Sequence, residues 1–88
     1  MKVPQRARSA PKGSTGNVIK HRLRHARRLH EPRLSQDALS GRLAARGVTI
    51  GRAGIAKIEA GRRGVSDFEI VALSQSLGVT VNWLLGVK

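Results

Sequence analysis

Apolar residues in the middle of the chain recur with the spacing of two short amphipathic helices. The first begins after Ser35, whose side-chain oxygen can cap a helix, and ends before the glycine-containing segment 46–49. The second runs from about Arg52 to Ala60, and Gly61 follows it with the backbone freedom that ends many helices. The predicted inward positions are Ala38, Leu39 and Leu43 in the first helix, and Ile55 and Ile58 in the second.

The same periodicity predicts further helices on both sides of this pair. One covers about residues 18–29 and is capped by Asn17. Another begins with a capping box between Ser66 and Glu69, in which each side chain accepts a hydrogen bond from the other residue's backbone N–H. A short last helix covers about residues 81–85. The predicted inward positions are Ile19, Leu23 and Ala26 in the first helix, Ile70, Leu73, Ser74 and Leu77 in the fourth, and Val79, Val81 and Leu84 around the last.

The two central helices are joined by a turn that contains glycine, and the second of them carries basic and small residues on its outer face. This arrangement is typical of a helix-turn-helix that binds DNA. We therefore predict an all-α fold of five helices without strands, in which the second and third helices form the helix-turn-helix.

Charge supports a polyanion as the partner of this helical domain. The 88 residues carry 17 Lys and Arg against 5 Asp and Glu, a net charge of +12. Nucleic acid is the commonest polyanion that such a surface binds. The aromatic residues are Phe68 and Trp83 alone, which argues against RNA or single-stranded DNA stacked on aromatic platforms.

Residues 1–16 are rich in Pro, Gly, Ser and basic residues and show no apolar period. We predict that they form a basic disordered tail ahead of a helix-turn-helix domain at residues 17–88. Such a tail can follow phosphates or enter a minor groove. It can equally serve as a solubilising extension, and the sequence leaves both roles open.

Other classes of function find less support. The chain has no cysteine, so neither a disulfide nor a cysteine-bound metal can stabilise it. His21 and His25 lie one helical turn apart, but no carboxylate or cysteine completes a metal site, which favours a solvated face. No nucleophile–base pair suggests an enzyme, and no cofactor is expected. No membrane span or signal peptide is evident, which predicts a cytoplasmic protein.

Three motifs follow one another at nearly the spacing of a known DNA-binding family. They are Leu34-Ser35-Gln36-Asp37-x-Leu39, Ile55-x-Lys57-Ile58-Glu59-x-Gly61 and Leu77-Gly78-Val79-x-Val81-x-Trp83-Leu84-Leu85. Together they resemble the Cro/repressor-type helix-turn-helix family, also called the xenobiotic-response-element (XRE) family, over about residues 17–86. The chain departs from the family in two places. About five extra residues separate Leu43 from Ile55, and about two extra residues lie in segment 30–33.

The resemblance implies which residues contact DNA. Arg52 begins the third helix and can donate two hydrogen bonds to a guanine, while alanines let the helix approach closely. Phosphate contacts position a protein without specifying sequence. An ordinary exposed helix face is the alternative, and Gly54 predicts a helix that is soft until DNA orders it. The implied base-reading residues are Arg52, Ala53, Ala56 and Lys57, and the implied phosphate contacts are Gln36, Gly51, Arg62 and Arg63.

The resemblance also implies that Glu59 pairs with Arg27 of the first helix; an exposed carboxylate is the alternative. A single recognition helix covers too few base pairs to select one operator, which favours a homodimer on DNA. Trp83 and Leu85 are expected at or near its interface, unless Trp83 folds back over the core.

We therefore predict a sequence-specific regulator of transcription, in particular a repressor, that reads the major groove of double-stranded DNA with its third helix. The alternative is an antitoxin, which would bind a toxin protein through one surface and its own operator through another. A protein that coats nucleic acid without sequence preference fits the charge but not the ordered motifs.

Overall fold

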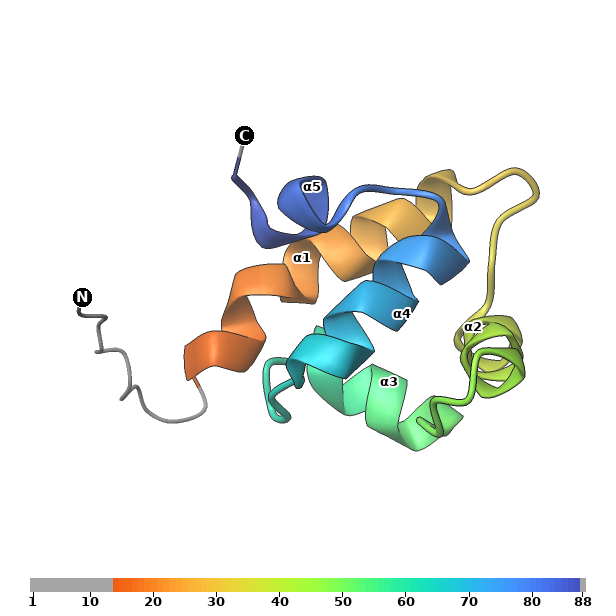
Figure 1. The fold of residues 1–88 in the computed structure, drawn as a ribbon, viewed down its shortest axis with the longest axis horizontal. Helices are drawn as coiled ribbons and strands as arrows, with labels where there is room; N and C mark the ends of the chain where they lie inside the picture. Colours follow the sequence, from red (N-terminus) through yellow and green to blue (C-terminus); the bar gives the residue numbers. More distant parts are fainter. Residues whose placement is uncertain (1–13, 88) are drawn as a thin grey trace.

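The computed structural model describes residues 14–87, and these residues form five α-helices without a strand (Figure 1). The predicted all-α class with five helices is therefore confirmed. The helices are α1 (Ser14–Leu29), α2 (Gln36–Ala45), α3 (Arg52–Glu59), α4 (Asp67–Leu77) and α5 (Val81–Leu85).

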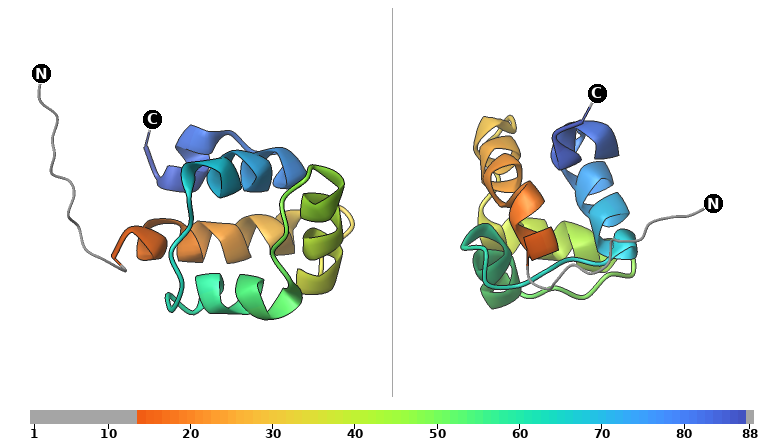
Figure 2. Two further views of the ribbon diagram at one scale, coloured as in Figure 1. Left: turned by 60° about the horizontal axis from the view of Figure 1, so that its bottom comes forward. Right: turned by 90° about the vertical axis from the view of Figure 1, so that its left-hand side faces the viewer.

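Helix α1 runs through the middle of the molecule, with α3 on one side and α5 on the other (Figure 1, Figure 2). Helix α2 packs against α3 and α4, and α4 packs against α5. One apolar core lies between the helices, and all five contribute to it. Its buried members are Ile19, Leu23, Ala26, Leu34, Leu39, Leu43, Ile50, Ile55, Ile58, Ala72, Leu73, Leu77 and Leu84.

Side-chain caps set the ends of the helices where the sequence predicted them. Ser35, Ser66 and Thr80 accept hydrogen bonds from backbone N–H groups in the first turns of α2, α4 and α5. The capping box between Ser66 and Glu69 is complete. After α3 the chain turns at Gly61, whose φ of 77° is a left-handed conformation that glycine adopts without strain.

Two local predictions are wrong. Helix α1 begins at Ser14, so Asn17 lies inside it and is not its N-cap residue. Residues 14–17 include no apolar residue, so helical periodicity could not reveal this extra turn. Ala38 is exposed because it lies about 100° around the helix from Leu39, which takes the inward position instead. Helix α1 thus includes the last three residues of the predicted tail. Residues 1–13 lie outside the described residues, so the tail's disorder and DNA contacts stay predictions.

The lengthened connection between α2 and α3 folds back onto the core. Its last apolar residue, Ile50, is 3% exposed, and the Ser40 hydroxyl donates a 2.7 Å hydrogen bond to the Ile50 carbonyl oxygen. A Cβ added at Gly54 would lie 2.9 Å from Cγ2 of Ile50. Because Gly54 has no side chain, Ile50 can pack against α3 at this position.

Candidate nucleic-acid interface

Helix α3 turns the predicted base-reading residues away from the core. Ile55 and Ile58 on its inner face are fully buried, and they fix the rotation of the helix about its axis. Because α3 lies on the opposite side of α1 from α5, its outer face is open to solvent (Figure 2). On that face Arg52, Ala53 and Lys57 are exposed, and Ala56 is half-buried.

The first turn of α3 has no side-chain cap. Gly51 occupies the N-cap position and is exposed, and because glycine has no side chain, the N-cap residue accepts no hydrogen bond from the first backbone N–H groups of α3. At α2, by contrast, Ser35 accepts one from Ala38. Unpaired N–H donors together with the helix dipole favour an anion at the start of α3.

The far end of α3 is held by the predicted ion pair between Arg27 and Glu59. Arg27 Nε donates to Glu59 Oε2 at 2.8 Å, and Arg27 Nη2 donates to Glu59 Oε1 at 2.9 Å. The Glu59 side chain is 2% exposed and that of Arg27 12%. Gln36 Nε2 adds a 3.1 Å hydrogen bond to Oε1, and Arg27 also donates to the Leu34 carbonyl oxygen. The cluster joins α1, α2 and α3.

The electrostatics of this cluster favour the ionised carboxylate. Burial alone would raise the pKa of Glu59, but several interactions outweigh it. Hydrogen bonds from Arg27 and Gln36, and the positive charges of Arg27 and Arg24, hold the pKa of Glu59 below its ordinary value. Glu59 is therefore ionised, and its contacts with Arg27 fix the orientation of α3 relative to α1.

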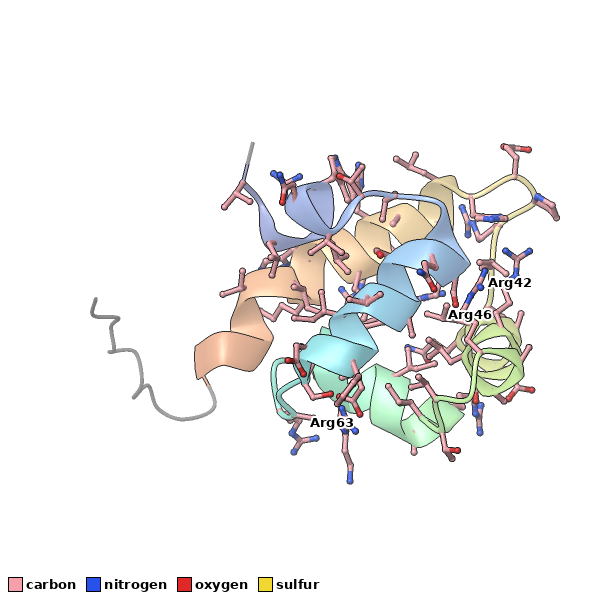
Figure 3. All side chains as sticks on the ribbon, in the orientation of Figure 1. Arg42, Arg46 and Arg63 are labelled. Atoms are coloured by element: carbon pink, nitrogen blue, oxygen red, sulfur yellow. The ribbon has the colours of Figure 1, made fainter. Side chains whose placement is uncertain are left out.

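Arg63, a predicted phosphate contact, is engaged inside the protein. Its Nη1 and Nη2 donate to the two carboxylate oxygens of Glu69 at 3.2 and 3.0 Å, and Nη1 also donates to the Gly64 carbonyl oxygen (Figure 3). The hydrogen bond from Arg63 is the main reason that the pKa of Glu69 lies below its ordinary value, and burial opposes it. This pair fixes the turn that leads from α3 to α4.

Sequence reasoning did not assign a role to Arg42 and Arg46, which fasten α2 to the end of α4 (Figure 3). Arg42 Nη1 donates to the Ser76 carbonyl oxygen at 3.1 Å, and Arg46 Nε donates to Ser76 Oγ at 3.2 Å. Arg46 also contacts the Gln75 carbonyl oxygen at 3.4 Å. The last carbonyls of a helix lack intrahelical partners and carry partial negative charge, so arginines suit this position.

The basic residues between positions 34 and 87 thus fall into two groups. Arg42, Arg46 and Arg63 serve contacts within the protein. The side chains of Arg52, Lys57 and Arg62 are exposed and make no hydrogen bond or ion pair with residues 14–87. These three cations belong to α3 and the turn that follows it.

A helix-turn-helix family model matches residues 26–84, which is most of the chain. The chain belongs to the Cro/C1/XRE-type helix-turn-helix family. No curated protein and no solved structure matches it. The family is one of DNA-binding regulators, and not typically of enzymes. The three exposed cations therefore lie on α3 and in the turn after it, within the part of the chain that the family model matches.

In this helix-turn-helix protein Trp83 packs against α1. Its ring stacks on that of His25, with centroids 6.1 Å apart, and the guanidinium carbon of Arg22 lies 5.0 Å from the indole centroid. Trp83 and Leu85 are both half-buried against the core. The packing matches the alternative in which Trp83 folds back, while an interface at Trp83 and Leu85 stays a prediction.

Residues 14–87 offer neither a metal site nor a membrane-spanning helix. No three His, Cys, Asp or Glu side chains are grouped so that they could hold a metal ion. No helix there is both long enough and apolar enough to cross a membrane.

Proposed function

We propose that this XRE-type protein is a sequence-specific repressor that inserts α3 into the major groove of double-stranded DNA. The observation that carries the proposal is the division of the arginines and lysines described above. Arg52, Lys57 and Arg62 are exposed and their side chains have no partner among residues 14–87, whereas Arg42, Arg46 and Arg63 serve contacts within the protein.

Arg52 is the residue to which we assign base recognition. It stands in the first turn of α3, and its guanidinium can donate two hydrogen bonds to guanine, worth about 1–3 kcal/mol of discrimination. Ala53 and Ala56 are short enough to let the helix approach the bases, and their methyl groups suit a thymine methyl. Lys57 lies one turn further along the same face.

Phosphate contacts are assigned to groups around α3. The uncapped N–H groups that follow Gly51 suit one phosphate, and the start of α2 at Gln36 suits another, although the Gln36 amide also binds Glu59. Arg62 suits a phosphate beyond the end of α3 because its side chain is exposed. Arg63 is a weaker candidate, since a phosphate would have to compete with Glu69.

Two copies are expected on each operator. Two-fold pairing places two recognition helices in successive major grooves, about 34–36 Å apart, and doubles the number of bases read. A palindromic preference follows from that symmetry.

The test is selection of bound duplexes from a random pool at two salt concentrations, with wild type, Arg52→Ala and Arg62→Ala. Wild type should select a palindrome, and Arg52→Ala should lose preference at one position of each half-site. Arg62→Ala should weaken all sequences alike and reduce the salt dependence by about one unit of slope. Equal effects of the two changes on every sequence would refute the assignment, and selection of no consensus by wild type would refute sequence-specific binding.

A further inference from the structure

An apolar groove lies between α4 and the connection that follows α2. Phe68 and Val71 on α4 are 80% and 46% exposed, although both are large apolar side chains. They border a groove of about 390 Å³, which Val48 and Ala72 also line. Apolar surface gathered at one place, rather than scattered singly, marks a site where another molecule binds.

The two ends of the groove carry opposite charges. Arg46 lies at one end, held by its hydrogen bonds to Ser76 and to the carbonyl oxygen of Gln75. Asp67 lies at the other end, and its carboxylate forms no ion pair with residues 14–87. Asp67 and Gln75 are eight positions apart in α4, which corresponds to about 12 Å along the helix axis.

We propose that this groove is the surface through which two copies of the chain pair, an inference that rests on the proposed function for the need of two copies. In a two-fold contact the same patch serves both molecules, so the patch must complement itself. A two-fold axis through the middle of the groove exchanges its ends. Asp67 of each copy then faces Arg46 of the other, and Phe68 of each copy enters the other's groove.

Charge favours a second copy over an acidic partner at this site. A chain of net charge +12 repels its own copies, so two copies meet most easily where the local charge is balanced. Arg46 and Asp67 balance each other in the groove lining. An acidic partner would instead be drawn to α1, which presents exposed Arg24 and Arg28. The groove is therefore the patch on which self-association costs least electrostatically.

The exposure of the two aromatic side chains favours the groove over the end of α5 as the interface. Trp83 is half-buried under the side chains of His25 and Arg22, whereas Phe68 is largely in solvent. Pairing through Phe68 therefore removes more apolar surface from water. Large side chains that enter a pocket on the partner and lose their contact with water contribute most of the binding energy of an interface.

The test measures pairing and DNA binding separately. Sedimentation equilibrium of the full chain, free and with a palindromic duplex from the selection above, compares wild type with Phe68→Ser and Val71→Ser. The matched control is Leu29→Ser, because Leu29 is 62% exposed on α1 and does not line the groove. Circular dichroism checks that each variant is folded, and a duplex with one half-site reports binding by a single copy.

We expect Phe68→Ser and Val71→Ser to weaken pairing by about tenfold or more, with half-site affinity unchanged, while Leu29→Ser pairs as wild type does. Undiminished pairing of both groove variants overturns the proposal. A further variant, Trp83→Ala, is measured alongside them, and if it loses pairing while the groove variants keep it, the interface lies at α5. Equal loss in Leu29→Ser also overturns the proposal. If the wild-type protein does not bind even a half-site specifically, the proposed function is wrong. The pairing of free protein, measured without DNA, then still tests the groove.

A charge-reversal pair tests the two-fold geometry. Asp67→Arg and Arg46→Asp should each pair poorly with themselves, and a mixture of the two should pair better than either alone. A mixture no better than its components contradicts the facing of Asp67 and Arg46. Because Arg46 also holds α4, the Phe68 and Val71 variants decide the outcome if Arg46→Asp does not fold.

Discussion

Ile50 occupies the space in which a side chain at Gly54 would begin, since a Cβ there would lie 2.9 Å from Cγ2 of Ile50. Ile50 is buried and β-branched, so its methyl group cannot swing aside easily. Through this contact the lengthened connection between α2 and α3 packs against α3. The sequence alone predicts that Gly54 weakens α3, but in the structure this glycine is needed so that Ile50 can pack against the helix.

Replacing Gly54 with alanine should therefore destabilise the protein. Alanine ordinarily favours a helix over glycine by about 0.5–1 kcal/mol. At this position overpacking against Ile50 should reverse the sign and cost about 1–3 kcal/mol, measured by urea denaturation. Gly41→Ala in α2 is the control because nothing lies within 4 Å of its Cβ, and it should stabilise by about 0.5–1 kcal/mol. Stabilisation by both changes would show that Ile50 does not press on α3.

The pair between Arg27 and Glu59 should dominate the polar contribution to stability. Removing either partner takes the main counter-charge from a group that is largely buried and should cost about 3–5 kcal/mol. The double variant should cost less than the sum of the single ones, which a double-mutant cycle by urea denaturation measures. Arg28→Ala, on the exposed side of α1, should change stability by no more than about 0.5 kcal/mol. Additive single effects would contradict the observed contact.

Stability should fall in acid because Glu59 and Glu69 both have lowered pKa values in the folded protein. A lowered folded-state pKa stabilises fully above the unfolded value, about 4.3 for Glu, and the stabilisation is lost as the pH falls through the folded-state pKa. The stability difference between wild type and Glu59→Gln should therefore be largest near neutral pH and shrink below about pH 4.3. A difference that stays constant from neutral to acid pH would show that ionised Glu59 is not what holds the cluster.

Arg62 and Arg63 are neighbours in sequence but should behave as different kinds of residue. Arg63→Ala removes the contact with Glu69 and should cost about 1 kcal/mol of stability. Arg62→Ala should leave stability within about 0.5 kcal/mol and reduce the salt dependence of DNA binding. Thermal or urea unfolding and DNA titrations at several salt concentrations separate the two. A loss of salt dependence in Arg63→Ala equal to that in Arg62→Ala would show that the Glu69 contact opens on DNA.

Local features of this fold could be predicted from the sequence because they arise within one or two helical turns. The caps at Ser35, Ser66 and Thr80 depend on a side chain and a backbone N–H a few residues apart. The inward positions of Ile55 and Ile58 follow from helical spacing. The pair between Arg27 and Glu59 spans 32 residues, and the family resemblance, rather than spacing, indicated it.

Tertiary structure alone decided which cations remain available to DNA. Arg42, Arg46 and Arg63 look like Arg52 and Arg62 in sequence, since all belong to polar faces or turns. Their partners depend on how α2 and α4 cross and on how the turn after α3 closes, which the packing of the whole core determines. Ile50 shows the same limit for apolar residues. It lies in the connection between α2 and α3, outside any helical period, so only the packed helices determine that it is buried.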